Sequence, residues 1–213
     1  MNAKDTEKRR SLSPAEQKRL AAFEETAARL GRQGYVRRDL TVGIVWANVF
    51  AVILGIPVLV AGVILFYLRN GAQPMRLQLL DIVCLMAGYF VLIVLHELVH
   101  GLTWACFPER HWRDIEFGFM KTYLTPYCTC LAPLPKGPYI LGALMPLLIT
   151  GLLPAVAGIL AGSYALLLLG VLMVAGAAGD ILIVWKILTY RTTAGEVLIY
   201  DHPTQAGSVI FER

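Results

Sequence analysis

The feature that most constrains the fold is a long stretch without a charged side chain. From Pro138 to Gly179 the sequence contains no Asp, Glu, Lys or Arg. A helix needs about 20 apolar residues to cross the hydrocarbon core of a bilayer, so this stretch is long enough for two crossings. Over the whole chain, 57% of the residues are hydrophobic and only 16% are charged, which is too little polar surface for a soluble domain. The sequence therefore predicts an integral membrane protein.

Four segments are apolar enough to form membrane-spanning helices. They cover about residues 42–68, 79–107, 139–160 and 164–188. The chain is polar over its first 40 residues, and a signal peptide would place its apolar core much nearer the start, so we expect no signal peptide. The predicted organisation is a polar segment over 1–40, a four-span domain over 41–188 and a tail over 189–213.

Residues 13–30 have the pattern of an amphipathic surface helix. Ser13 and Glu16 form an S-x-x-E capping box, which marks the start of a helix. An apolar stripe follows at helical spacing and consists of Leu20, Phe23, Ala27 and Leu30. Such a helix can lie on an anionic membrane surface or pack against the protein's own cytosolic face, and we expect the second arrangement.

The distribution of Lys and Arg predicts how the spans are oriented. Of the 19 such residues, 17 lie in segments 1–40 and 108–138 or after the middle of the fourth span, and 2 lie in the 69–78 loop. Because cytoplasmic loops are rich in Lys and Arg, both termini and the 108–138 connection are predicted to be cytosolic. These membrane-flanking residues account for the net charge of +4, so we expect no nucleic-acid partner.

The 108–138 connection has the pattern of β-strands. Residues Ile115, Phe117 and Phe119 alternate with less apolar neighbours, which is the period of a strand. A second extended run covers 123–131 after a tight connection at Lys121 and Thr122, and the tail is expected to form another strand pair around Pro203 and Gly207. The predicted fold class is an all-α integral membrane protein with four transmembrane helices, an N-terminal amphipathic helix and small cytosolic β elements.

The four cysteines, Cys84, Cys106, Cys128 and Cys130, do not suggest the disulfide framework of a secreted protein. Cys128 and Cys130 are two residues apart, so on a strand they would share one face and could bind a metal. We expect ordinary reduced thiols instead.

The sequence HELVH at residues 96–100 has the H-E-x-x-H pattern of zinc-dependent hydrolases. On a helix, His96 and His100 lie about 40° apart and one turn apart in height, so both rings can reach one zinc ion. Glu97 lies about 100° further round, where a general base for a zinc-bound water must stand. Polar side chains inside a span carry a desolvation cost, which argues against histidines that only hydrogen-bond across the helices.

A catalytic zinc site needs a third protein ligand and an open position for water. Asp180 is the one acid within the fourth predicted span. At the rise of a helix, it lies about 12 to 14 Å from the cytosolic end, at the same level as His96 and His100. The predicted metal ligands are therefore His96, His100 and Asp180. Asp180 could instead be a buried polar tether, and the alternative third ligands are His202, Asp201 and His111.

These residues resemble two groups of known proteins. The order of H-E-x-x-H helix, β-rich connection, third span and aspartate-bearing span, over about residues 79–188, is similar to the site-2-protease type of intramembrane zinc metalloprotease. In that type a glycine usually follows the aspartate, whereas here Gly179 precedes Asp180. The segments HELVHGLTW, FGF, PYCTC and DHP-x-x-x-G resemble a family of small bacterial membrane proteins described as zincin peptidases. The resemblance implies zinc as the cofactor and a bacterial cytoplasmic membrane as the location.

The leading hypothesis is a membrane-embedded zinc metallopeptidase in which Glu97 activates a zinc-bound water. Its partners would be the lipid bilayer and a peptide or membrane-protein substrate, which could add in extended form to an edge strand within 115–131. The alternative is a non-hydrolytic metal-binding membrane protein, such as a sensor, scaffold or carrier. Glu97 favours hydrolysis, because a site that only binds metal has no use for a carboxylate at that position.

Overall fold

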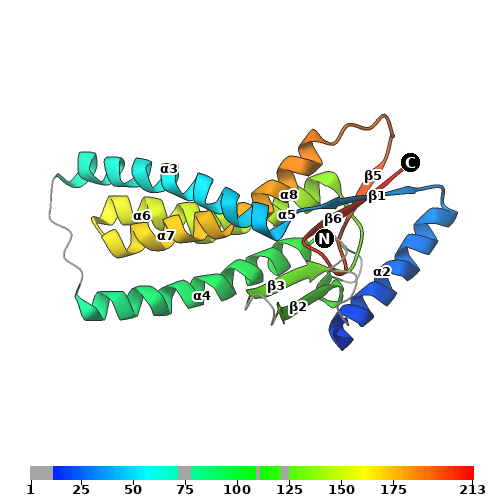
Figure 1. Ribbon diagram of the computed structural model, residues 1–213, viewed down its shortest axis with the longest axis horizontal. Coiled ribbons are helices and arrows are strands. Elements are labelled where there is room, and N and C mark those ends of the chain that lie inside the picture. The colour runs from blue at the N-terminus through cyan, green and yellow to red at the C-terminus, as the bar shows by residue number, and fades with distance from the viewer. Residues whose placement is uncertain (1–11, 72–77, 109–110, 121–124) are drawn as a thin grey trace, which may run out of the picture.

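The computed structural model describes residues 12–71, 78–108, 111–120 and 125–213, which are mostly helical (Figure 1). The helices are α2 (Pro14–Arg32), α3 (Ile44–Asn70), α4 (Leu79–Trp104), α5 (Lys136–Pro146), α6 (Leu153–Ala161), α7 (Tyr164–Gly176) and α8 (Ala178–Thr189), with a 3-10 turn η1 (His111–Asp114) and a π-helical segment η2 (Leu147–Leu152). The strands are β1 (Val36–Thr41), β2 (Ile115–Met120), β3 (Thr125–Cys130), β4 (Leu134–Pro135), β5 (Val197–Asp201) and β6 (Gly207–Glu212). The predicted connection at Lys121 and Thr122 lies outside the described residues.

Three helices are long and apolar enough to cross a membrane, namely α3, α4 and the continuous helix α5–η2–α6 over Lys136–Ala161. Helices α7 and α8 meet the same criterion only together, so the described residues hold three such helices, or four if this pair is one span. Many large apolar side chains of α3 and α4 are exposed, including Val45, Leu68 and Leu80. Exposed apolar surface of this extent suits contact with lipid rather than with water.

The fourth predicted span differs from the single helix that we expected over 164–188. Helices α7 and α8 meet at Ala177 with a bend of 43°. The residues from 175 to 179 are all Gly or Ala, and Gly stabilises a helix poorly because it loses more backbone freedom than other residues on ordering. As a consequence Asp180 lies in the first turn of α8 instead of in the middle of a long helix.

The fold is mostly helical with β elements, as predicted, but the class all-α does not cover it, because the described residues contain six strands in two antiparallel sheets. Strands β2 and β3 form the predicted pair in the 108–138 connection, and β5 and β6 form the predicted pair in the tail. The tail pair belongs to a four-stranded sheet of order β1-β6-β5-β4. We did not predict β1 or β4: β1 reads VRRDLT, which has three charged residues in six, and β4 has only two residues.

Helix α2 covers one face of the four-stranded sheet (Figure 1). Phe23 is fully buried at the centre of this contact, where its ring meets Tyr200 of β5 and Phe211 of β6. Leu30 is buried in the same cluster, and Leu20 and Ala27 pack against it. The predicted apolar stripe therefore docks on the protein's own sheet, and the predicted Ser13–Glu16 capping box is also confirmed.

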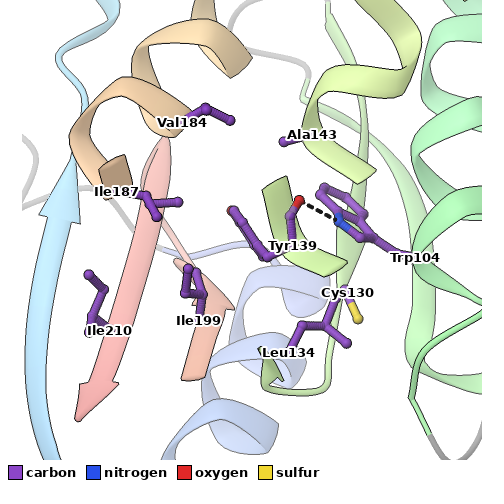
Figure 2. Close-up of a cluster of buried hydrophobic side chains, with 9 residues drawn as sticks. All are labelled: Trp104, Cys130, Leu134, Tyr139, Ala143, Val184, Ile187, Ile199 and Ile210. Carbon is purple, nitrogen blue, oxygen red and sulfur yellow. Dashed lines mark hydrogen bonds between the residues drawn. The ribbon is translucent and has the colours of Figure 1, made fainter. Parts of the chain in front are cut away.

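The opposite face of the sheet packs on the ends of α5 and α8, as Figure 2 shows. Ile199 and Ile210 of the sheet lie in one buried cluster with Ile187 of α8 and Tyr139 of α5. Both sheets and α2 lie at the same end of the long helices, while the α6–α7 connection lies at the other end (Figure 1). The molecule therefore has an apolar helical part and a mixed α/β part that caps one end of it.

The packing of Phe23 generates a prediction about α2. Replacing a buried Phe by Ala removes apolar contacts and leaves a cavity, at a cost of about 3 to 5 kcal/mol. We expect Phe23→Ala to release α2 from the sheet, so that hydrogen exchange becomes faster in residues 14–32 and 207–212 but not in α3. Glu25→Ala, at an exposed position of the same helix, is the control. Unchanged exchange in Phe23→Ala would show that α2 is not held by this cluster.

Candidate metal centre

Helix α4 presents His96 and His100 on one buried face near its C-terminal end. The two side chains are one helical turn apart, and their ring centroids lie 4.9 Å from each other. Residue exposures are only 7% for His96 and 4% for His100, because this face of α4 packs against α5, η2 and β3. Both rings therefore point into the protein and away from the exposed apolar surface of α4.

Asp180 reaches the two histidines from the bend between α7 and α8. Its Oδ2 atom lies 3.2 Å from His96 Nε2 and 3.6 Å from His100 Nε2. The position in the first turn of α8 is favourable for a carboxylate, because the free N–H groups at a helix N-terminus attract negative charge. The bend that the sequence did not predict thus creates a suitable environment for the acid that it did predict.

The separations between Asp180 and the two histidines are close to those around a tetrahedral zinc ion. Two ligands at about 2.0 to 2.1 Å from such an ion lie about 3.3 Å from each other, close to the distances from Asp180 Oδ2 to the two Nε2 atoms. One ligand atom from each of the three residues lies within 4.8 Å of the others. Across residues 12–71, 78–108, 111–120 and 125–213, no other group of three or more His, Cys, Asp or Glu residues is as compact.

The second nitrogen of His100 is held by the backbone of α5. His100 Nδ1 lies 2.9 Å from the carbonyl oxygen of Gly142. An Nδ1–H that donates to this oxygen leaves Nε2 unprotonated and free to bind a metal. Residue 142 has to be glycine, because a Cβ there would collide with the indole of Trp104. Trp104 in turn stacks on the His100 ring at 5.0 Å and donates its Nε1–H to the Tyr139 carbonyl (Figure 2).

Glu97 lies beside this group and not within it. It is half-buried and lies near the backbone of Cys128 in β3. It also interacts electrostatically with His96, His100 and Asp180. The structure thus places Glu97 next to the candidate metal centre, where its role as a general base stays a prediction.

The alternative third ligands lie in other environments. Asp201 accepts hydrogen bonds from the Tyr139 hydroxyl at 2.6 Å, the Cys130 backbone N–H at 2.8 Å and the Thr129 hydroxyl at 3.1 Å. Burial raises the pKa of the Asp201 carboxyl, although these three donors act in the opposite direction. His202 Nδ1 accepts from the backbone N–H groups of the turn after β5, and His111 Nδ1 contacts the Ala105 carbonyl.

The two neighbouring cysteines do not form a metal site with other ligand residues in the described part of the chain. Burial raises the pKa of the Cys130 thiol to about 12 and also raises the pKa of Cys128. A metal binds the thiolate, and these thiols stay protonated at neutral pH. The expectation of ordinary reduced cysteines agrees with these environments.

Comparison with known sequences finds a family for the segment that contains this site. Residues 89–194 match a family whose description is "Putative zincin peptidase". This segment belongs to that family. It includes the end of α4, the β2–β3 sheet, helices α5 to α8 and all three candidate ligands. The zincin family implies metallopeptidase chemistry with zinc. Searches of curated proteins and of solved structures find no match to the chain.

Sequence reasoning missed the supporting roles of Gly142 and Tyr139, and it considered Asp201 only as an alternative metal ligand. A backbone carbonyl and a buried hydrogen-bond acceptor leave no spacing signal that would indicate such roles. Asp201 connects β5 to β3 and α5, and the Tyr139 ring stacks on Trp104 at 5.6 Å. The C-terminal sheet therefore supports the residue that packs on His100.

The geometry predicts which residue supplies the third ligand. We expect purified wild-type protein to bind about one zinc per chain, and Asp180→Ala to lose most of it because only two ligands remain. Metal content can be measured by mass spectrometry on detergent-purified protein. His202→Ala is the control and should keep its zinc. The opposite pattern, with zinc kept in Asp180→Ala and lost in His202→Ala, would move the third ligand to the tail.

Proposed function

We propose that the protein is a membrane-embedded zinc metallopeptidase that hydrolyses peptide bonds of membrane or membrane-proximal proteins. The observation that carries the proposal is the convergence of His96 Nε2, His100 Nε2 and Asp180 Oδ2 between helices apolar enough to cross a membrane. Three ionisable side chains in such surroundings are costly unless they serve a function. Binding a metal accounts for all three at once.

The neighbouring groups suit hydrolysis. A zinc ion held by these three residues would lower the pKa of a bound water to about 7 and polarise a substrate carbonyl. Glu97 would take a proton from the attacking water and later deliver it to the departing amine. The carboxylate of Glu97 lies near both histidines, Asp180 and the backbone of Cys128. A protein that only binds metal does not need a carboxylate at this position.

The two-stranded sheet offers a place for the substrate. Strand β3 pairs with β2, and the described residues add no third strand to this sheet. A substrate in extended conformation could pair with an edge of the sheet, which would present its scissile carbonyl in a defined register. Because the backbone of Cys128 in β3 lies near Glu97, a peptide bound along β3 would lie close to the proposed base. A helical substrate would first have to unwind, since its carbonyls are already hydrogen-bonded.

The proposed location is a bacterial cytoplasmic membrane, with both termini on the cytosolic side. The support comes from the excess of Lys and Arg in the segments 1–40 and 108–138. The sheets and α2 lie at one end of the apolar helices, as such an orientation requires (Figure 1). The arrangement of an H-E-x-x-H helix followed by an aspartate-bearing helix supports the likeness to site-2 proteases.

The test of the proposal separates metal binding from hydrolysis. Glu97→Gln keeps the size of the side chain but removes the base, so we expect it to retain zinc and to lose at least about 100-fold in peptidase rate. Cleavage can be followed by mass spectrometry of new peptide ends, with soluble and single-span peptides offered to protein in lipid nanodiscs. Glu25→Ala, on the exposed face of α2, is the control for the preparation.

Three outcomes distinguish the hypotheses. A peptidase is supported if wild-type protein cleaves the peptides and Glu97→Gln does not. In addition, a chelator should stop cleavage by the wild type, and added zinc should restore it. Zinc binding without cleavage of any peptide would favour a non-hydrolytic metal-binding protein. Wild-type protein that binds no zinc, even after resupply at neutral pH, would overturn the proposal.

A further inference from the structure

The ring of His96 has a second contact that the proposed chemistry does not use. His96 Nδ1 lies 3.4 Å from the hydroxyl oxygen of Thr150. Thr150 is 1% exposed, so its hydroxyl exchanges no hydrogen bonds with solvent. The pair brings together α4 and η2, which are 54 residues apart in sequence.

A second hydrogen bond determines which atom of the pair carries the proton. The Thr150 hydroxyl donates to the carbonyl oxygen of Pro146, one turn earlier, at 2.8 Å. A hydroxyl has one proton to donate and lone pairs to accept with. Since its proton goes to Pro146, the oxygen of Thr150 presents a lone pair to His96. The ring can satisfy this lone pair only with a proton on Nδ1.

The backbone of this helix is adapted to the contact. Thr150 lies in the π-helical segment η2, and Pro154 follows four residues later. Pro154 has no N–H for the Thr150 carbonyl, and its ring would collide with that carbonyl in a regular α-helix. The turn of a π-helix is wider than that of an α-helix, which leaves room for the Pro154 ring beside the Thr150 carbonyl. Gly151 lets the segment approach α7 closely, because a Cβ there would lie 2.9 Å from Val174 Cγ2.

We propose that Thr150 is a positioning residue for the metal centre, which holds His96 in the tautomer with Nδ1 protonated and Nε2 directed at the metal. The inference rests on the metal site of the proposed function. With Thr150 in this role, a protein oxygen accepts the Nδ1–H of each histidine, because the Gly142 carbonyl does the same for Nδ1 of His100. Removing such supporting hydrogen bonds typically weakens metal binding by about 10- to 100-fold.

A purely structural role for Thr150 leads to a different expectation. If the side chain only fills space between α4 and α7, valine should replace it, because valine has nearly the same shape. If the hydroxyl orients His96, valine leaves Nδ1 without a partner in a buried site, and the ring is free to rotate or to change tautomer. The two roles therefore differ in the zinc affinity of Thr150→Val.

The experiment measures zinc affinity of the full chain in detergent by competition with a chromogenic chelator. We expect Thr150→Val to bind zinc about 10- to 100-fold more weakly than wild type, and Thr150→Ser to stay within about 3-fold because it keeps the hydroxyl. Thr103→Val is the matched control, since the Thr103 hydroxyl also donates to the carbonyl four residues earlier, on Val99, and its hydrogen bonds among the described residues do not include a histidine. In a His96→Ala background, Thr150→Val should cause no further loss.

Further measurements keep the test decisive if valine perturbs folding. Thr150→Ser and Thr150→Ala can be compared with each other, and the thermal unfolding of each metal-free variant reports any general damage. Equal zinc affinity in wild type and Thr150→Val, or in the Ser and Ala variants, would overturn the role of Thr150 while leaving the metal centre intact. Absence of zinc from wild type would instead overturn the proposed function, and this inference with it.

Discussion

The contact between Asp180 and the two histidines of α4 is the interaction on which the rest of the arrangement depends. It joins two helices that are apolar along most of their length, at a point where each exposes polar atoms to the other. An ionised carboxylate or a protonated imidazole in such surroundings has a large desolvation cost unless it is paired. A divalent cation satisfies all three groups together, which is why this cluster suggests metal binding more strongly than an ordinary ion pair does.

The surrounding structure holds the cluster in place by packing and by backbone hydrogen bonds. His100 lies between the Gly142 carbonyl and the ring of Trp104, and Trp104 lies against Tyr139. The Tyr139 hydroxyl binds Asp201 at the end of β5. Through this series of contacts, the sheet built from both ends of the chain supports a site inside the helical part. The protein thus uses its small α/β portion to stiffen one wall of the site.

Much of the local structure could be predicted because it depends on neighbours in sequence. The capping box at Ser13 and Glu16, the apolar stripe with Phe23, and the alternation in β2 are local patterns, and the structure has each of them. Strand β1 was not predicted because its six residues acquire strand conformation by pairing with β6, about 170 residues later. The bend at Ala177 and the π-helical segment at Thr150 were also missed. A run of Gly and Ala and the nearby Pro154 permit these departures from a regular helix, but neither local signal specifies the resulting geometry.

By itself, the sequence determined that the chain has helices suited to a membrane and that His96, Glu97 and His100 lie close together on one helix. Both results follow from composition and from the fixed geometry of an α-helix. Only the tertiary structure decided that Asp180, and not Asp201, His202 or His111, meets the two histidines. It also decided which backbone carbonyl and which hydroxyl orient their rings. These contacts join residues 42 to 84 positions apart, and no local pattern encodes a distance across the fold.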